Sequence, residues 1–226
     1  MSKLELQNIY YRYKGSNKDV LKDVTATFDK GKLHAIVGPS GSGKTTLLSI
    51  MAGLDEPTRG SIFIDGKDLK EMDADEYRRD CISMIFQAYQ LFPLLTSLEN
   101  VCFPMEYKGV DPKTAAETGR EVLNALGIKG DKQGRYPANL SGGEQQRVAI
   151  ARTLATGAKI ILADEPTGNL DDDNTERILD ILKQLAHEQN FCIIVVTHDT
   201  ELAESCDTIW KITEGEMTEM VRESVK

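Results

Sequence analysis

The chain has 226 residues with a net charge of −9, 40% hydrophobic residues and 28% charged residues. This length predicts one well-buried α/β core, and this composition excludes a disordered or fibrous chain. The acidic balance argues against nucleic acid as a partner, because phosphate backbones are bound mainly by clustered Lys and Arg. We therefore expect a single domain over residues 1–226.

Apolar runs in the sequence are short. The longest, residues 160–163 and 192–196, are far below the roughly 20 residues that cross a bilayer. Residues 1–13 lack the apolar run and small residues of a secretory signal. The four cysteines are widely spaced without a CxxC pair, which indicates reduced thiols and neither a disulfide framework nor a zinc site. These features predict a cytoplasmic chain that does not itself span a membrane.

Strand-like segments dominate the first half of the chain. Residues 33–37 form a compact apolar strand that runs into a glycine-rich stretch at 38–43, and an apolar helical pattern follows through Met51. The other predicted strands are residues 4–13, 24–28, 61–64 and 82–86, with turns at 14–17 and 65–66.

Helical periodicity begins in the middle of the chain. Residues 97–126 are predicted to be helical with breaks at Pro104, Gly109 and Pro112, as part of a helical lobe at about 88–145 between two halves of the core. Helices and buried strands then alternate, which predicts a parallel sheet covered on both faces. The predicted elements here are helices at 143–155 and 174–187 and strands at 160–163, 192–196 and 208–212, with a short helix before the last strand.

The glycine-rich stretch satisfies the phosphate-binding pattern G-x-x-x-x-G-K-[ST]. Its glycines let backbone N–H groups point inward at phosphate oxygens, and the following helix start adds its positive dipole end. Lys44 is expected to reach the β- and γ-phosphates, and the Thr45 hydroxyl to bind Mg²⁺. A flexible loop is the alternative, but a strand precedes the stretch and a helix follows it. The motif comprises Gly38, Pro39, Ser40, Gly41, Ser42, Gly43, Lys44 and Thr45.

Two carboxylates follow the apolar strand at residues 160–163. A buried parallel strand delivers such residues to the carboxyl edge of the sheet, beside the glycine loop. Asp164 is therefore expected to hold Mg²⁺, which prefers oxygen ligands. Glu165 is expected to act as the general base that accepts a proton from the attacking water. A solvated helix cap is the alternative for a DE pair taken alone.

The segment LSGGEQQ begins the predicted helix at 143–155. Ser141 and Glu144 form an ordinary capping box, S-x-x-E, which explains a helix start. The capping box does not explain Gly142 and Gly143, because each glycine costs about 1 kcal/mol of helix propensity. Bare N–H groups at a helix start bind anions, so a second phosphate-binding element is expected here. Two such elements in one chain predict nucleotides shared between two copies of the chain.

The segments GPSGSGKTT, ILADEPT and LSGGEQQ together make the chain resemble the ATP-binding cassette (ABC) family over essentially its whole length. The resemblance implies an α/β P-loop NTPase core with a mainly parallel sheet, an antiparallel β subdomain near the N-terminus and an inserted α-helical lobe. It also implies an ATPase that uses ATP and Mg²⁺. The homodimer of such proteins encloses two ATP molecules between the phosphate loop of one chain and the LSGGEQQ segment of the other, which is called the signature segment.

Further site residues follow from the resemblance alone. Gln87 matches the glutamine that senses Mg²⁺ and the γ-phosphate, and His198 matches the switch histidine; both are expected in the catalytic site. Tyr13 occupies the place of an aromatic residue that stacks on adenine, with Tyr10 and Tyr11 as close competitors. The remaining implied nucleotide contacts are Thr46, Ser141, Gly142, Gly143, Glu144 and the dimer-interface residue Asp171.

The motifs look most like the branch of macrolide exporters, lipoprotein-releasing systems, antimicrobial-peptide resistance transporters and the division-associated cassette. This implies the energy-supplying subunit of a transporter, peripheral on the inner face of the cell membrane through a separate permease. Residues 91–95 are interpreted either as core packing or as permease contact. A non-transport complex that regulates cell-wall enzymes is the alternative. A DNA-repair or chromosome-structuring ATPase is disfavoured, because the chain has no long heptad stretch.

Overall fold

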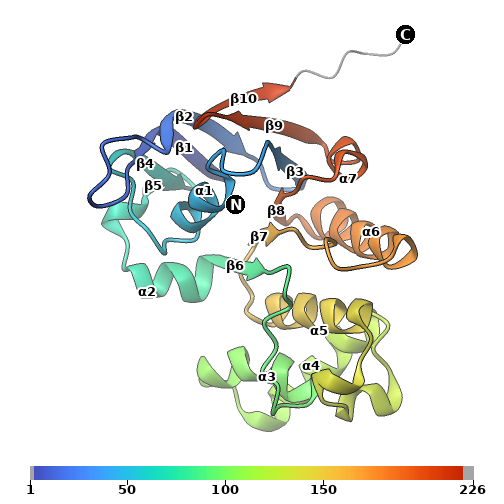
Figure 1. Cartoon of the computed structure of the whole chain (residues 1–226). Coiled ribbons are helices and arrows are strands. Elements are labelled where there is room, and N and C mark those ends of the chain that lie inside the picture. Colours follow the sequence, from blue (N-terminus) through green and yellow to red (C-terminus); the bar gives the residue numbers. More distant parts are fainter. Residues whose placement is uncertain (1–2, 221–226) are drawn as a thin grey trace.

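The computed structural model describes residues 3–220, which form two sheets, with helices on both sides of the larger one (Figure 1). The smaller sheet is antiparallel throughout, in the order β2-β1-β4-β5. It is the antiparallel β subdomain that the family resemblance implies. Its strands are β1 (Leu4–Tyr11), β2 (Leu21–Phe28), β4 (Arg59–Ile64) and β5 (Lys67–Asp68).

The larger sheet has the order β10-β9-β3-β8-β7-β6. All neighbours pair in parallel except β10, which returns antiparallel to β9, so the predicted parallel sheet is confirmed. The sequence analysis missed β10, because only Met217 of this strand is buried and the rest has no alternation of apolar residues. The strands are β3 (Lys32–Val37), β6 (Ile82–Ile85), β7 (Ile160–Asp164), β8 (Cys192–Val196), β9 (Thr208–Thr213) and β10 (Glu216–Met220).

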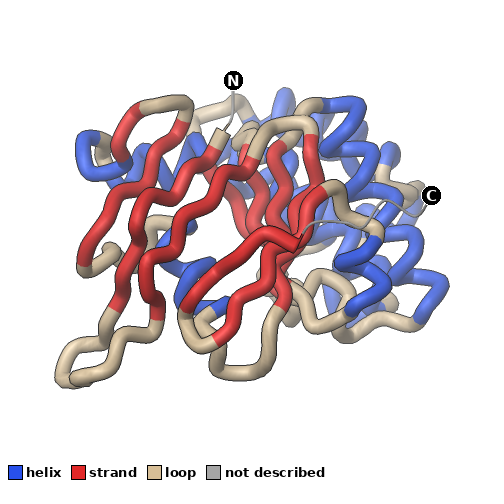
Figure 2. Tube along the Cα trace, turned by 90° about the horizontal axis from the view of Figure 1, so that it is seen from above, coloured by secondary structure: helices blue, strands red, loops and turns tan. Residues whose placement is uncertain are grey.

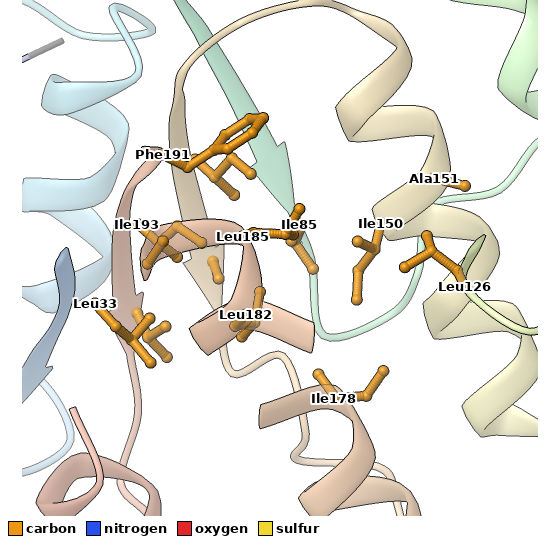
Figure 3. Packing of buried hydrophobic residues seen from close by; sticks show 14 of the residues in the cluster. Leu33, Ile85, Leu126, Ile150, Ala151, Ile178, Leu182, Leu185, Phe191 and Ile193 are labelled. Atoms are coloured by element: carbon orange, nitrogen blue, oxygen red, sulfur yellow. The ribbon is translucent and has the colours of Figure 1, made fainter. Parts of the chain in front are cut away.

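Alternation along the strands divides the apolar residues between two cores, one on each face of the larger sheet. In β3, Leu33 and Ala35 belong to the core beneath the C-terminal helices, whereas Ile36 belongs to the core shared with the smaller sheet. Successive side chains of a strand point to opposite faces, so one apolar run fills both cores. Figure 3 shows the first core, where Leu33 and Ile193 from the sheet lie near Leu182 and Leu185 from a helix.

Helices cover both faces of the larger sheet, and Figure 2 shows the helices in blue and the strands in red as seen from above. The longest has 18 residues and charged residues throughout, and within residues 3–220 no helix is both long and apolar enough to cross a membrane. The α-helices are α1 (Lys44–Met51), α2 (Ala74–Glu76), α3 (Ser97–Tyr107), α4 (Pro112–Ala125), α5 (Gly142–Ala155), α6 (Asp172–Gln189) and α7 (Thr200–Glu204). Single turns of tighter or wider helix occupy Leu69–Glu71, Tyr77–Cys81, Gly130–Gly134 and Pro137–Asn139.

The helices α3, α4 and α5 pack on one another and form the predicted helical lobe (Figure 1). The boundary at about 88–145 and the single domain over residues 1–226 stay predictions. The expected break at Pro104 is wrong, because α3 continues through this proline to Tyr107. Proline removes one backbone donor and crowds the carbonyl group four residues earlier, and the Thr96–Glu99 capping box at the helix start offsets part of that cost. Gly109 ends the turn after α3 at φ 84°, and Pro112 is the first residue of α4.

Candidate active site

A cavity of about 640 Å³ lies beyond the carboxyl ends of β3, β7 and β8. These strands are parallel, so the segments that follow them meet at the same edge of the sheet. The cavity gathers residues from five separate stretches of the sequence. Its lining is Tyr13, Val20, Gly38, Ser40, Gly41, Gly43, Lys44, Thr45, Thr46, Gln87, Asp164, Glu165, Val196 and His198. Val20 was not predicted, and nothing in the local sequence marks it.

The glycine loop ends at Gly43, which begins α1 with φ 111° and supplies no side-chain cap. Only glycine adopts this conformation without strain. The first N–H groups of α1 therefore have no capping side chain and remain available to an anion. Lys44 curls back over the loop, and its Nζ donates to the carbonyl oxygens of Gly38 at 2.8 Å and Pro39 at 2.9 Å. Of the predicted loop residues, Pro39 and Ser42 do not line this cavity but an adjacent one.

The two carboxylates lie together in the cavity as predicted. Burial raises the pKa of Asp164, and the neighbouring charge of Glu165 raises it further, whereas Lys44 opposes the shift. Glu165 has φ 47°, and its backbone N–H donates to the carbonyl oxygen of Val196 at 2.9 Å. An acidic residue in this strained conformation at a cavity wall is typical of a functional position.

Residues that follow β8 hold the Glu165 carboxylate. His198 Nδ1 lies 2.7 Å from Oε1, and the Thr197 hydroxyl donates to Oε2 at 3.2 Å. The His198 side chain is 74% exposed, so it can also reach a ligand in the cavity. Thr197 was missed by the sequence analysis, although it directly precedes the predicted histidine. Together these contacts orient the carboxylate from two sides.

Gln87 lines the cavity from the loop after β6. Its carbonyl oxygen accepts a hydrogen bond from Asn169 Nδ2 at 3.0 Å. The same loop continues through Tyr89 and Gln90, which both have positive φ. Arg152 of α5 donates to the carbonyl oxygens of these two residues. Asn169 and Arg152 were not predicted as site residues, because contacts to backbone carbonyls leave no pattern in the sequence.

Of the three neighbouring tyrosines, Tyr13 is the one that lines the cavity. Its hydroxyl hydrogen-bonds the Thr46 hydroxyl at 2.8 Å, and its ring is half exposed. Tyr11 is buried beneath it with the rings edge to face, and Tyr10 lies under the guanidinium of Arg59. The structure therefore favours Tyr13 over Tyr10 and Tyr11 as the aromatic residue that can stack on a nucleotide base in the cavity.

The signature segment lies outside the cavity. Ser141 and Glu144 form the predicted capping box, with Glu144 N–H to Ser141 Oγ at 3.3 Å and Ser141 N–H to Glu144 Oε2 at 3.0 Å. Lys132 adds an ion pair with Glu144 at 2.7 Å. None of Ser141, Gly142, Gly143 and Glu144 lines the cavity formed by the same chain.

Close packing supplies a reason for the two signature glycines that the sequence analysis did not consider. A Cβ on Gly143 would lie 2.2 Å from Asn174 Oδ1 and 2.5 Å from its Cγ. A Cβ on Gly142 would lie 2.8 Å from the hydroxyl oxygen at the end of the Tyr89 side chain, which can shift more easily. Glycine at these positions can both leave backbone N–H groups open to an anion and satisfy this close packing. The glycines alone are therefore weaker evidence for phosphate binding than the sequence suggests.

Asp171 also lies outside the cavity and caps α6. Its carboxylate accepts hydrogen bonds from the backbone and side-chain nitrogens of Asn174, both at 2.8 Å, which lowers its pKa. The acidic residues Asp172 and Asp173 occupy the first helical turn, where their negative charges interact favourably with the positive end of the helix dipole.

The donor set of the cavity fits Mg²⁺. Thr45, Gln87 and Asp164 line the same cavity and offer a hydroxyl, an amide and a carboxylate oxygen. Mg²⁺ is commonly bound by one or two carboxylates together with substrate phosphates and water rather than by an all-protein cage. A glycine loop at a helix start, beside two carboxylates at the carboxyl edge of a parallel sheet, defines a phosphate-loop nucleoside triphosphatase.

Comparison with known proteins narrows this class. The pattern of the ABC transporter family matches residues 21–168. YclH, an ABC transporter ATP-binding protein of Bacillus subtilis (strain 168), is 41% identical over 226 residues, which cover 100% of this chain and 99% of YclH. The macrolide export ATP-binding/permease protein MacB of Shewanella sp. (strain W3-18-1) is 42% identical over 94% of this chain, and the match spans 33% of MacB. The chain thus corresponds to about a third of that relative.

Solved structures agree. The dimeric structure of MJ0796, a bacterial ABC transporter cassette, has a TM-score of 0.85 and 37% sequence identity, with 97% of this chain and 100% of that chain covered. A second structure of MJ0796, in a post-hydrolysis state bound to ADP and Pi, has the same TM-score and identity. This chain belongs to the ABC transporter family. It is an ATPase of that family, similar to the branch that contains the macrolide exporters.

Proposed function

We propose that the chain binds ATP with Mg²⁺ in the cavity at the sheet edge and hydrolyses it. The glycine loop and the start of α1 bind the phosphates, with Lys44 on the β- and γ-phosphates and Tyr13 against adenine. Thr45, Gln87 and Asp164 hold Mg²⁺, which neutralises the negative charge of the phosphates when bound. The shared position of these residues on one cavity supports the assignment.

Glu165 is the general base in this proposal. Its carboxylate accepts a proton from the water that attacks the γ-phosphate. His198 keeps the carboxylate oriented during this attack. The support is the 2.7 Å contact between His198 Nδ1 and Glu165 Oε1 at the cavity wall. Gln87 senses the occupied site from the loop after β6.

The active form is a homodimer with two ATP molecules at its interface. The observation that carries this proposal is that Ser141, Gly142, Gly143 and Glu144 do not line the cavity of their own chain. A second copy supplies them, with Asp171 at the interface, and the N–H groups at the start of α5 then face the γ-phosphate. The dimeric form of MJ0796 supports this assembly.

The partner of the dimer is a membrane-embedded permease, which places the chain at the inner face of the cell membrane. Three exposed aromatic rings on the helical lobe support a docking surface, which we call the aromatic strip: Phe92, Phe103 and Tyr107. Adjacent rings of the strip lie 4.8 and 6.5 Å apart. In the segment 91–95, Leu91 packs against the core, as the core-packing interpretation expects. Phe92, Pro93 and Leu94 are exposed, which leaves them free to contact the permease.

The fused ATP-binding/permease architecture of MacB favours transport over a division-type complex. We propose that hydrolysis powers export or release of a substrate through that permease. The identity of the protein encoded beside this chain distinguishes the two roles. A permease with a large extracellular domain supports export or release, and a four-helix division partner supports regulation of cell-wall enzymes.

Glu165→Gln tests the function as a whole. The variant should bind ATP normally but hydrolyse it about 10²- to 10⁴-fold more slowly, because the amide cannot accept the proton. ATP should then hold the protein as a dimer in light scattering, and Ser141→Arg in the same background should keep it monomeric. Normal turnover by Glu165→Gln contradicts the general-base role. A dimer that persists with Ser141→Arg contradicts the shared nucleotide site.

A further inference from the structure

The turn that carries Glu165 is strained at its first residue. Glu165 begins it with φ 47°, and Gly168 N–H closes it by donating to the Glu165 carbonyl oxygen at 3.1 Å. The left-handed backbone conformation costs a non-glycine residue about 1–2 kcal/mol of stability, and it persists only where the surrounding structure holds it. The hydrogen bond from Glu165 N–H to Val196 fixes the start of the turn. Asn169 Nδ2 donates to the Gln87 carbonyl oxygen at the far end. The middle of the turn, between these two contacts, needs an anchor of its own.

Gln146 of α5 supplies that anchor. Its Nε2 donates to the carbonyl oxygen of Pro166 at 2.6 Å, and Pro166 directly follows Glu165. The Gln146 side chain is fully buried, and its Oε1 has no hydrogen-bond partner within residues 3–220. Burying an unsatisfied amide oxygen costs about 1–3 kcal/mol. A methionine of similar size would fill the same space without that cost, so packing alone does not account for a glutamine here.

The position of Gln146 on α5 connects the turn to the signature segment. The helix begins after Ser141, and Gln146 lies three residues after Gly143, on the same face of the helix. Between them the helix is continuous and starts from a complete capping box. A movement of the signature segment is therefore transmitted to the Pro166 carbonyl by a single rigid element.

We propose that Gln146 is a positioning residue for hydrolysis, which holds the Pro166 carbonyl and thereby sets the place of the Glu165 carboxylate relative to α5. The inference rests on the proposed role of Glu165 as general base. It gives each chain a direct mechanical link between the signature segment, which meets the nucleotide of the second copy, and its own catalytic turn. Gln146 does not line the cavity and is proposed to act only through the turn.

Gln146→Met tests the link, because the side chain keeps its volume and loses its donor. Turnover at saturating ATP should fall about 10- to 100-fold, the cost of a base displaced by roughly 1 Å. The dissociation constant of a fluorescent ATP analogue should not change, since no residue of the glycine loop is touched. Gln146→Asn keeps an amide but is one methylene shorter, and it should lower turnover in the same way if Gln146→Met folds poorly.

Thr153→Val is the matched control on the same helix. The Thr153 side chain is also buried, and its hydroxyl donates to backbone carbonyl oxygens of Ala149 and Met84, away from the catalytic turn. Its loss should lower the melting temperature and leave turnover unchanged. A general loosening of α5 would instead lower turnover in both variants, which would overturn the proposal.

The Glu165→Gln background separates positioning from structural damage. Where the base is already absent, Gln146→Met should cause no further loss of single-turnover hydrolysis, because the two residues act as one unit. An equal additional loss in that background, or normal turnover by both Gln146 variants, overturns the inference. The proposed function is tested separately, because normal turnover by the Glu165→Gln single variant would contradict it whatever the Gln146 variants do.

Discussion

Lys44 makes two hydrogen bonds to its own loop, with the carbonyl oxygens of Gly38 and Pro39. In the proposed function the same ammonium group contacts the β- and γ-phosphates, so it exchanges backbone partners for phosphate oxygens. Both sets of hydrogen bonds have the charged ammonium as donor, but the phosphate oxygens also carry negative charge and attract it more strongly than neutral carbonyl oxygens do, which makes this exchange favourable. Nucleotide binding is therefore the step in which we expect Lys44 to matter.

Lys44→Ala should weaken ATP binding about 10- to 100-fold, which corresponds to the loss of about 1.5–3 kcal/mol for hydrogen bonds to a charged group. Isothermal titration with ATP and Mg²⁺ measures the change. Lys70→Ala is the control, because its ammonium also donates to a backbone carbonyl, that of Gly60, but does not line the cavity. Equal affinities of the two variants would remove Lys44 from the binding site.

Asp164 makes stability depend on pH in an unusual direction. Burial and the charge of Glu165 raise its pKa, so the folded protein binds this proton more tightly than the unfolded chain does. The ionised form therefore opposes folding, and its cost appears as pH rises from the ordinary aspartate range through the raised pKa.

Asp164→Asn should raise the melting temperature of the nucleotide-free protein at pH 7. The difference from the unmodified protein should shrink as the pH falls toward the ordinary range of an aspartate. The same variant should lose the part of the stabilisation by ATP that depends on Mg²⁺, since it lacks the metal-binding carboxylate. A lower melting temperature at neutral pH would contradict the direction of the shift.

At the scale of elements, α5 and α6 are in contact near their starts. Gly143 of α5 meets Asn174 of α6, whose side chain is held by Asp171 and also accepts a hydrogen bond from Arg147. The cap of α6 therefore leaves no room for a methyl group on α5. This contact joins the signature segment to the predicted dimer-interface residue.

Gly143→Ala should destabilise the nucleotide-free protein by about 1–3 kcal/mol through overpacking. Helix propensity alone predicts the opposite sign, a gain of about 1 kcal/mol. Asn174→Ala added to Gly143→Ala should recover much of the loss, because it removes the atoms that clash. Gly134→Ala is the control, since an added Cβ meets nothing there. Thermal unfolding without nucleotide measures all four proteins.

At the scale of the whole molecule, the cavity and the aromatic strip lie on different parts of the chain. The cavity is at the edge of the larger sheet, whereas Phe103 and Tyr107 belong to α3 in the helical lobe. The loop that contains Gln87 connects the two parts and is bound by Arg152 and Asn169. This arrangement suits an ATPase whose work is delivered to a separate partner.

Phe103→Glu and Tyr107→Glu should abolish co-purification with the proposed permease partner. The ATPase activity of the isolated protein should remain, because neither residue lines the cavity. Tyr136→Glu is the matched control, an exposed aromatic residue of the same lobe outside the strip. Unchanged co-purification of the strip variants would locate the docking surface elsewhere.

Residues adjacent in the sequence were predictable because their chemistry is local. The glycine loop, the carboxylates that follow β7 and the capping box at Ser141 all depend on short-range geometry, and apolar runs alternating with helices predicted the parallel sheet. The family resemblance was needed for Gln87, His198 and Tyr13, because a single glutamine, histidine or tyrosine has no distinctive spacing.

Only the tertiary structure decided which groups meet. The contacts of Gln146 with Pro166, Asn169 with Gln87 and Thr197 with Glu165 join residues 20 to 82 positions apart. They are hydrogen bonds set by how strands and helices pack, and no sequence pattern encodes such pairings. Local chemistry thus determined what this protein can bind, and long-range packing decided how its catalytic carboxylate is held.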